Sequence, residues 1–527
     1  MDGSSEHLNH QQHEFVEIKK VSESNSNNSD CNSNNSNNKD LQAAIESFEK
    51  TFQMKPQQVS RAPGRVNIIG EHIDYNGFGV LPMALEKSIF VACASTPTES
   101  GIIAIDLHST SPGADACQHT CNFSKIPSDS NAAPPFETHH RDWSQYVLCA
   151  LYGVLEALST QKRKQLGGQK LNVMVHGTIP QGAGLSSSSA LVVSSALVFL
   201  SLIGELSNFT KTQIASLCAR SERWVGTEGG GMDQAISLFA EENTACYIQF
   251  NPTLSHIVIP LPKSTSWVVC HSLEESHKRG TAATHFNKRV VECKIGCRMV
   301  AQLLHWQEHH QSGYPESLWE LVGKTGLPLG QIEAMVSESL KNVYTKQEVL
   351  MAILGDNSQP DKVQLELLAS KLGITRKAGK EALAASEVFH VRDRLLHVFS
   401  ETQRVQEFVC HCSEDHTDES ILVYDLGKLM YSSHKSCASS YECSSPKVDK
   451  LQEICAIGPG AVGVRMTGAG WGGSVICLVQ SKDVEAFCTH VQNRYYDRLT
   501  EASKQQQHES EYMFVTRSAQ GSNVFLL

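Results

Sequence analysis

The sequence predicts an α+β protein built from two halves, and three patterns point to this. Strand-like and helical stretches alternate between Val59 and about residue 260. Residues 188–202 form an almost entirely apolar helical stretch, which indicates a helix buried on all sides. After a helical, turn-rich region at 305–400, the chain returns to strands and a helix near its C-terminus. A chain of 527 residues has room for two or three domains.

The N-terminal residues 1–39 are predicted to be a disordered tail. Residues 22–38 read SESNSNNSDCNSNNSNN, in which 14 of 17 residues are Asn or Ser. So polar a segment buries too little apolar surface to offset the entropy of ordering. Order is expected to begin at Asp40, a candidate helix N-cap. Apolar residues then recur at helical spacing: Leu41, Ile45, Phe48 and Phe52.

We expect the first folded half to cover residues 40–256 and the second to cover 257–527. Strands are predicted in the first half at 88–94 and 171–176. The elements predicted in the second half are strands at 266–270, 462–466, 474–479 and 512–516, and helices at 282–304 and 484–499.

Composition excludes several classes of protein. The 45 basic and 56 acidic residues give a formal charge of 45 − 56 = −11, which argues against binding to nucleic acid or anionic membranes. The most apolar stretch, 190–204, is too short to span a bilayer and contains three serines. Residues 1–20 are polar and lack the apolar region of a signal peptide, so a cytoplasmic protein is expected. The 17 cysteines form no CxxC pair, which predicts reduced thiols rather than a zinc site or a disulfide framework.

The segment 180–190, PQGAGLSSSSA, predicts a phosphate-binding turn. A strand runs into a glycine- and serine-rich turn that opens directly into the apolar helix. Gly182 and Gly184 let the backbone approach an anion closely, and the N–H groups at the helix start favour negative charge. Serine hydroxyls add donors, and one of them can bind Mg²⁺. The alternative is a small-residue turn that packs a helix on a sheet.

Two other nucleotide-binding patterns fail on context. Gly323-Lys-Thr325 resembles the end of a Walker A loop, but Leu318 occupies the position of the required glycine. Residues 467–473, TGAGWGG, match GxGxxG, yet they precede a strand rather than a helix. We expect this third segment to be a glycine-rich turn between antiparallel strands, in close backbone contact with a ligand or with another loop.

Charged side chains crowd the segment 64–75, GRVNIIGEHIDY. Carboxylates and an imidazole at this density suit a sugar, whose hydroxyls need paired donors and acceptors; a solvated loop is the alternative. Downstream, Asp233 follows three glycines, where it could orient or deprotonate a hydroxyl. Glu222 lies in a helical segment just before it. Taken alone, each of these two carboxylates could be an ordinary surface charge.

Together, the segments 64–75, 180–190, 229–234 (GGGMDQ) and 467–473 resemble the galactokinase branch of the GHMP small-molecule kinases in both order and spacing. The likeness runs from about residue 40 to the C-terminus. It implies two domains, an N-terminal α/β domain like domain 2 of ribosomal protein S5 and a C-terminal ferredoxin-like plait with a helical insertion.

The resemblance also implies roles for individual residues. Asp233 would be the catalytic aspartate, with Arg65 beside it to stabilise transferring charge. The residues implied to bind the sugar are Arg65, Glu71, His72, Asp74 and Asp233. The residues implied to hold ATP are Gly182, Gly184, Ser186, Ser187, Ser188 and, for adenine, Trp143 with Tyr146; the alternative for these two aromatic residues is a place in the core. Ser188 and Glu222 match positions that bind Mg²⁺ in the wider family.

Within this branch, the sequence is most similar to N-acetylgalactosamine kinases, through stretches such as 182–192, 226–237, 284–293 and 440–446. Galactose-specific relatives typically carry Tyr where this chain has Phe286; a packing role for this aromatic ring is the alternative. The loop at 277–281 is slightly longer than its family equivalent. The resemblance implies an ATP- and Mg²⁺-dependent, monomeric sugar 1-kinase that prefers N-acetylgalactosamine, with galactose as the alternative substrate. A non-catalytic sugar and ATP sensor is a further alternative, but the serine-rich loop is uninterrupted and Asp233 is present.

Overall fold

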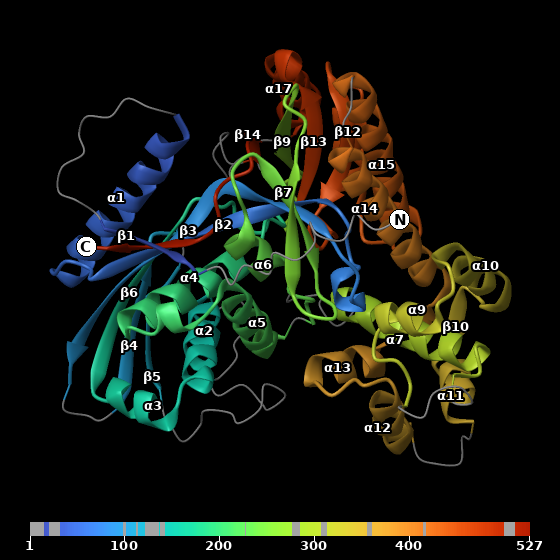
Figure 1. Cartoon of the computed structure of the whole chain (residues 1–527), viewed down its shortest axis with the longest axis horizontal. Coiled ribbons are helices and arrows are strands. Elements are labelled where there is room, and N and C mark those ends of the chain that lie inside the picture. Colours follow the sequence, from blue (N-terminus) through green and yellow to red (C-terminus); the bar gives the residue numbers. More distant parts are fainter. Residues whose placement is uncertain are drawn as a thin grey trace, which may run out of the picture.

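The computed structural model describes residues 15–20, 32–98, 102–111, 114–121, 136, 143–226, 228–276, 285–306, 313–355, 361–414, 418–499 and 512–527. A seven-stranded sheet and a four-stranded sheet form the centres of the two halves (Figure 1). The fold therefore has the α+β character that the sequence predicts.

The seven-stranded sheet has the order β1-β15-β2-β3-β6-β4-β5. Its central pairs β2–β3 and β3–β6 are antiparallel, and β4 runs parallel to β6. The bounds of its strands are β1 Glu17–Lys20, β2 Gln58–Ile69, β3 Leu81–Pro97, β4 Ile103–Ser109, β5 Cys117–Cys121, β6 Gln169–Gly177 and β15 Asn523–Leu526. The last strand of the chain thus returns to the first half and lies beside β2.

Helices cover both faces of this sheet. On one face lies α1, Asn32–Phe52, whose Leu41, Ala44 and Phe48 pack on Phe90 of β3 (Figure 1). The other face carries α4, which is buried as its apolar composition predicts. The helices of this half are α2 Ser144–Ala157, α3 Thr160–Leu166, α4 Ser187–Leu202, α5 Lys211–Glu222 and α6 Met232–Phe239. A hairpin of β7 Thr244–Gln249 and β8 Ser255–Pro260 follows.

The four-stranded sheet has the order β12-β13-β9-β14 and is antiparallel throughout. Its strands are β9 Thr265–His271, β12 Ala461–Thr467, β13 Ser474–Gln480 and β14 Met513–Thr516. Helices α15 and α16 pack on β12, and α17 lies at the end of the four-stranded sheet, at the top of Figure 1. These helices are α15 Glu419–Ser439, α16 Pro446–Ala456 and α17 Val484–Arg494.

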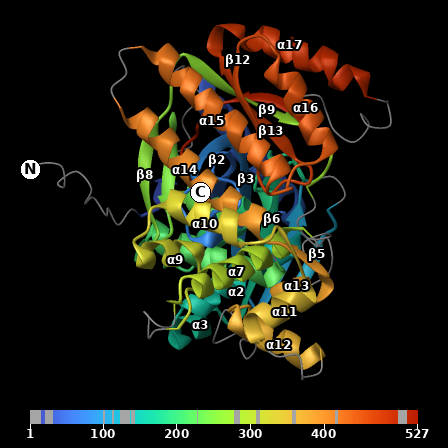
Figure 2. The same cartoon turned by 90° about the vertical axis from the view of Figure 1, so that its right-hand side faces the viewer.

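The helical region of the second half forms a cluster, seen at the front of Figure 2, which packs on α15 through α14. It contains the helices α7 Phe286–Leu303, α9 Leu318–Thr325, α10 Leu329–Ser339, α11 Lys346–Leu354, α12 Asp361–Lys371, α13 Lys377–Ala385 and α14 Arg392–Ser413, with a small hairpin of β10 Val343–Thr345 and β11 Val388–His390. Among the described helices, none is long and apolar enough to cross a membrane.

The expected disorder of residues 1–39 needs correction at two places. Residues Glu17–Lys20 form β1, which pairs in parallel with β15, and Val16 beside it is buried. Helix α1 begins at Asn32 rather than at Asp40. Backbone hydrogen bonds hold a strand regardless of side-chain polarity, and a packed helix extends cooperatively beyond its buried turns. The rest of the predicted tail, 1–14 and 21–31, lies outside the described residues.

The boundary expected between residues 256 and 257 falls inside β8, which pairs with β7 of the first half. The chain changes sheets between β8 and β9. Strand β15 then crosses back, so the two halves are not continuous in sequence.

Candidate active site

The sugar-type segment 64–75 begins inside β2 and continues into a loop. The pairing of β2 with β3 shifts register between Pro63 and Arg65 and again between Asn67 and Ile69. Such bulges change the direction of side chains relative to the sheet. The loop then turns sharply, since Gly70 and His72 both have positive φ, 109° and 63°. Arg65 therefore reaches Asp233 of the first half, whereas Glu71 reaches Gly468 of the second half.

Arg65 connects three of the sequence motifs. Its Nε donates to Oδ1 of Asp233 at 2.7 Å, and its Nη1 donates to the carbonyl of Gly184 at 2.6 Å. The guanidinium is 2% exposed and the Asp233 side chain 13% exposed. Ion pairs this well shielded from water are stronger than surface pairs. Asp233 itself is in the first turn of α6, after Gly231 in a left-handed conformation.

One cleft gathers all five residues that the sequence implies for sugar binding. Its polar lining also includes Glu222 and Gln234, and its apolar lining includes Phe286. Gly230 forms part of the wall, where a Cβ atom would come within 2.6 Å of the Asp74 side chain. The sugar-type residues in the lining are Arg65, Glu71, His72, Asp74 and Asp233.

Glu71 is held by the second half of the molecule. Its Oε1 accepts a hydrogen bond of 2.8 Å from the N–H of Gly468 and lies 3.4 Å from Nη1 of Arg465. Burial raises the pKa of Glu71, while the guanidinium groups of Arg465 and Arg65 act in the opposite direction. The glycine-rich segment 467–473, which we call the third motif, and strand β12 therefore fix the Glu71 carboxylate at the edge of the cleft.

His72 belongs to a chain of hydrogen bonds behind the cleft. Its Nε2 lies 3.0 Å from the carbonyl of Ala469, which can only accept, so Nε2 carries the proton. Its Nδ1 then accepts from the Tyr75 hydroxyl at 3.0 Å, and Tyr75 lies 2.5 Å from the hydroxyl of Tyr441. Tyr441 in turn lies 3.4 Å from Sγ of Cys293 on α7. This chain sets the tautomer and orientation of His72.

Phe286, the first residue of α7, lies in the cleft wall. Its ring centroid is 5.6 Å from that of His72 and 5.6 Å from that of Tyr75. The side chain is half-buried rather than part of the core. Position 286, where this chain has Phe and galactose-specific relatives typically carry Tyr, therefore borders the cleft.

The glycine–serine turn leads into the N-terminus of α4 as predicted. The side chain of Ser186, the N-cap residue, makes no capping hydrogen bond, and the first intrahelical bond runs from the N–H of Ala190 to the carbonyl of Ser186. Ser186 has a positive φ of 59°, and within the described part of the chain its buried Oγ has no hydrogen-bond partner. Uncapped N–H groups and an unpaired hydroxyl are what a phosphate group would satisfy. Ser187 and Ser188 are half-buried in the same turn.

The third motif packs against this turn through its backbone, which confirms the expected close contact with another loop. A Cβ atom on Gly468 would come within 2.3 Å of the carbonyl oxygen of Gly184. The Ser474 hydroxyl donates to the carbonyl of Ala183 at 2.8 Å. The two glycine-rich segments are therefore one interlocked unit, which only glycine at position 468 permits.

Glu222 is almost fully buried at the cleft and has partners on both carboxylate oxygens. Ser189 donates to Oε1 at 3.0 Å, and Nε2 of Gln234 donates to Oε2. The serine that contacts Glu222 is thus Ser189 rather than Ser188. The pairing of Ser188 with Glu222 as metal ligands stays a prediction.

Trp143 precedes α2, and its Nε1 donates to the carbonyl of Asp115 at 3.3 Å. It does not line the cleft, so its adenine-binding role also stays a prediction, as does that of Tyr146. The longer loop at 277–281 lies outside the described residues.

Sequence reasoning missed several residues of the site. Arg465 and Tyr441 lie far in sequence from the segment 64–75 that they contact, and no role was predicted for either. Gln234 could have been considered because it directly follows Asp233.

Comparisons with known proteins agree with this site. A model of the galactokinase galactose-binding signature matches residues 46–95, and models of the N-terminal and C-terminal domains of GHMP kinases match residues 145–241 and 422–497. The chain is 36% identical to a galactokinase of Dictyostelium discoideum over 90% of this chain and 92% of the relative. It is 30% identical to a galactokinase of Schizosaccharomyces pombe over 87% of this chain and 91% of the relative.

The fold of a solved structure also matches. The galactokinase of Lactococcus lactis complexed with galactose superposes with a TM-score of 0.61 at 21% identity, covering 92% of this chain and 99% of that chain. The fold and the matched domains define a GHMP kinase. Within that family, the chain belongs to the galactokinase branch and is a sugar kinase, a phosphotransferase.

Proposed function

We propose that this protein transfers the γ-phosphoryl group of ATP to the C1 hydroxyl of galactose. The observation that carries the proposal is the Arg65–Asp233 ion pair in a cleft lined by the sugar-type residues. The galactokinase names of the similar proteins support galactose as the substrate. Galactose is therefore preferred here over N-acetylgalactosamine, the substrate expected from sequence alone.

Asp233 would accept the proton of the C1 hydroxyl as the hydroxyl attacks phosphorus. Arg65 keeps the aspartate oriented through the 2.7 Å hydrogen bond and places a positive charge beside the reacting groups. Phosphoryl transfer depends mainly on such positioning and charge stabilisation. Glu71 and Asp74 would hold other sugar hydroxyls through their carboxylate oxygens. His72, whose two ring nitrogens already bond to Ala469 and Tyr75, would contact the sugar with its ring.

The turn at the start of α4 fits a triphosphate. The unpaired Oγ of Ser186 and the uncapped helix terminus are the groups that would hold it, with Gly182 and Gly184 allowing its close approach. Ser188 and Glu222 offer oxygen ligands of the kind that Mg²⁺ prefers. When bound, Mg²⁺ would neutralise phosphate charge.

N-acetylgalactosamine is the second candidate substrate, and Phe286 is the observation that favours it. The ring borders the cleft and cannot donate a hydrogen bond to a sugar hydroxyl. It offers apolar surface that the methyl of an acetamido group could contact.

The test is a side-by-side measurement of kcat/KM for galactose, N-acetylgalactosamine and glucose, with ³¹P NMR to locate the phosphate. We expect phosphate on C1 and turnover of galactose well above that of glucose. A higher kcat/KM for N-acetylgalactosamine would select the second candidate. Failure to consume ATP with any hexose would contradict both and favour a sensor.

A further inference from the structure

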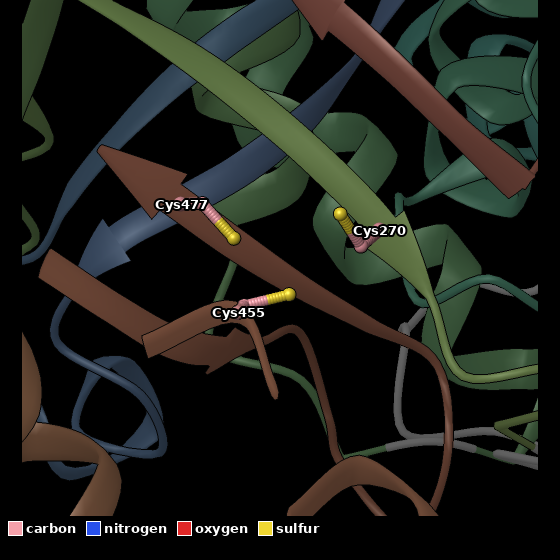
Figure 3. A group of neighbouring side chains, drawn as sticks. All are labelled: Cys270, Cys455 and Cys477. Atoms are coloured by element: carbon pink, nitrogen blue, oxygen red, sulfur yellow. The ribbon is translucent and has the colours of Figure 1, made fainter. Parts of the chain in front are cut away.

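Three cysteines from separate elements converge inside the four-stranded half. Cys270 is on β9, Cys477 on β13 and Cys455 on α16, and their sulfur atoms turn toward a common point (Figure 3). The three Sγ atoms all lie within 4.8 Å of one another. Each residue is 0% exposed. We call these residues the thiol triad.

The fold itself creates the triad. In the antiparallel β9–β13 pair, Cys270 is opposite Val475 and Cys477 is opposite Val268. The two cysteines are therefore diagonal neighbours on one face of the sheet. Helix α16 packs on this sheet and brings Cys455 over them. The site consequently exists only in the folded protein and uses none of the residues assigned to the kinase reaction.

The groups that act most strongly on the triad among the described residues are thiols and phenols rather than cations. Within the described part of the chain, the groups that act electrostatically on the three thiols are one another, Cys488, Tyr431, Tyr495 and Tyr496. Burial opposes ionisation of Cys455, yet hydrogen bonds from the two other thiols lower the pKa of its thiol to about 6.

This charge balance decides which occupant fits. Three thiolates around Cu⁺ leave a charge of 1 − 3 = −2, and three around Zn²⁺ leave 2 − 3 = −1. An unpaired buried charge costs several kcal/mol or more. Zinc in structural sites also takes four ligands, and the described residues place no fourth His, Cys, Asp or Glu in this group. A trivalent centre with three thiolates is neutral and needs only three ligands.

We propose that the thiol triad is a binding site for trivalent arsenic. Arsenous acid, As(OH)₃, would react with the three S–H groups to give one As(S-Cys)₃ centre and three water molecules. Three As–O bonds break and three As–S bonds form, and each thiol proton leaves with a hydroxide. No atom changes oxidation state. The product links β9, β13 and α16 in the core of the second half.

The test uses the full chain incubated for hours at 37 °C with excess arsenous acid, because the buried thiols become accessible only through local opening. Native mass spectrometry should show the mass of one arsenic atom added and three hydrogens lost. X-ray absorption should show three sulfur neighbours and no oxygen around arsenic. We also expect Tm to rise by about 3 °C or more, since the three-thiol site exists only in the folded state.

Cys455→Ala removes one ligand, and Cys93→Ala is the matched control, a cysteine that is likewise 0% exposed but lies outside the triad. The control should retain the three-sulfur product, whereas Cys455→Ala should lose it. Circular dichroism verifies that both variants fold, and the absorption spectrum of the unmodified protein tests the proposal without any variant.

Cys437 and Cys443 are two further buried cysteines that lie next to each other. A competing reaction of arsenous acid with this pair would give two As–S bonds and leave one hydroxyl on arsenic. That spectrum, no arsenic uptake, or an unchanged three-sulfur product in Cys455→Ala would overturn the proposal. So would retention of copper or zinc in preference to arsenic when the three are offered together.

Discussion

The side chains of Arg65 and Asp233, 168 positions apart in sequence, are joined by a hydrogen bond of 2.7 Å from Nε to Oδ1. The arginine leaves β2 at a register shift, and the aspartate sits in the first turn of α6. Because the same guanidinium also binds the carbonyl of Gly184, one side chain aligns the sugar-type segment, the phosphate-type turn and the aspartate. The three motifs therefore share one guanidinium as a common partner.

Tyr441→Phe tests the hydrogen-bond chain behind His72. The substitution keeps the ring but removes the hydroxyl that lies 2.5 Å from Tyr75. We expect the KM for sugar to rise about fivefold, equivalent to the roughly 1 kcal/mol of one hydrogen bond, while the KM for ATP stays unchanged. Steady-state kinetics with each substrate varied in turn measures both.

Tyr496→Phe is the matched control for this variant. Tyr496 is also buried, and its hydroxyl donates to the carbonyl of His271, away from the cleft. Removal of the Tyr496 hydroxyl should lower Tm without affecting the KM for sugar or the KM for ATP. Equal sugar KM values for Tyr441→Phe and the unmodified protein would show that the chain of hydrogen bonds does not position His72.

Phe286→Tyr tests sugar choice. A hydroxyl at this position in the cleft wall could bond to galactose, and it would also occupy space near the sugar. We expect the ratio of kcat/KM for galactose to that for N-acetylgalactosamine to rise about tenfold, or about 1.4 kcal/mol, mainly through KM. A ratio that stays within about twofold would make Phe286 a packing residue, by the same free-energy scale.

His397→Gln tests a predicted acid sensitivity. His397 is fully buried and binds the carbonyl of Glu71, and burial lowers its pKa to about 4 from an ordinary 6.5. Between these values the unfolded chain binds more protons than the folded one, so stability falls as pH falls from 6.5 to 4. The loss amounts to about 3 kcal/mol at most. Urea unfolding across this pH range should show a shallower decline for the variant. Parallel declines would contradict the assignment.

Deletion of residues 1–20 tests the role of β1. This strand adds backbone pairs to the edge of the seven-stranded sheet, but its four side chains are exposed. We expect kcat and KM to remain unchanged and Tm to fall by about 1–3 °C, the effect of roughly 1 kcal/mol in a chain of this size. Unchanged Tm would show that the strand contributes nothing to stability, and lost activity would show that the strand supports the active site.

The sequence predicted those parts of the molecule that local patterns encode. Glycines beside Asp233 and Ser186 mark turns, and the apolar run at 188–202 marks a buried helix, so the motifs and their elements were recognisable. The cleft gathers Glu71, His72 and Asp74 from the loop after Gly70 and Asp233 from the helix start after Gly231, while Arg65 enters from a register shift in β2.

Other features depend on contacts that no local pattern records. Arg465 lies in a strand, and nothing in its neighbourhood indicates that it pairs with Glu71, 394 positions away. Tyr441 meets Tyr75 only when α15 and α7 are in place. Strand β1 pairs through its backbone, which leaves its side chains polar and makes the segment look unstructured.

The most direct test of the account is the turnover of Asp233→Asn at saturating galactose and ATP, measured with the unmodified protein in parallel. If Asp233 accepts the proton of the C1 hydroxyl, kcat should fall by ~10² or more, the scale of a general base. Calorimetry should still detect binding of ATP, because the turn at α4 is untouched. A folded variant that phosphorylates galactose at C1 with near-normal kcat would contradict the account.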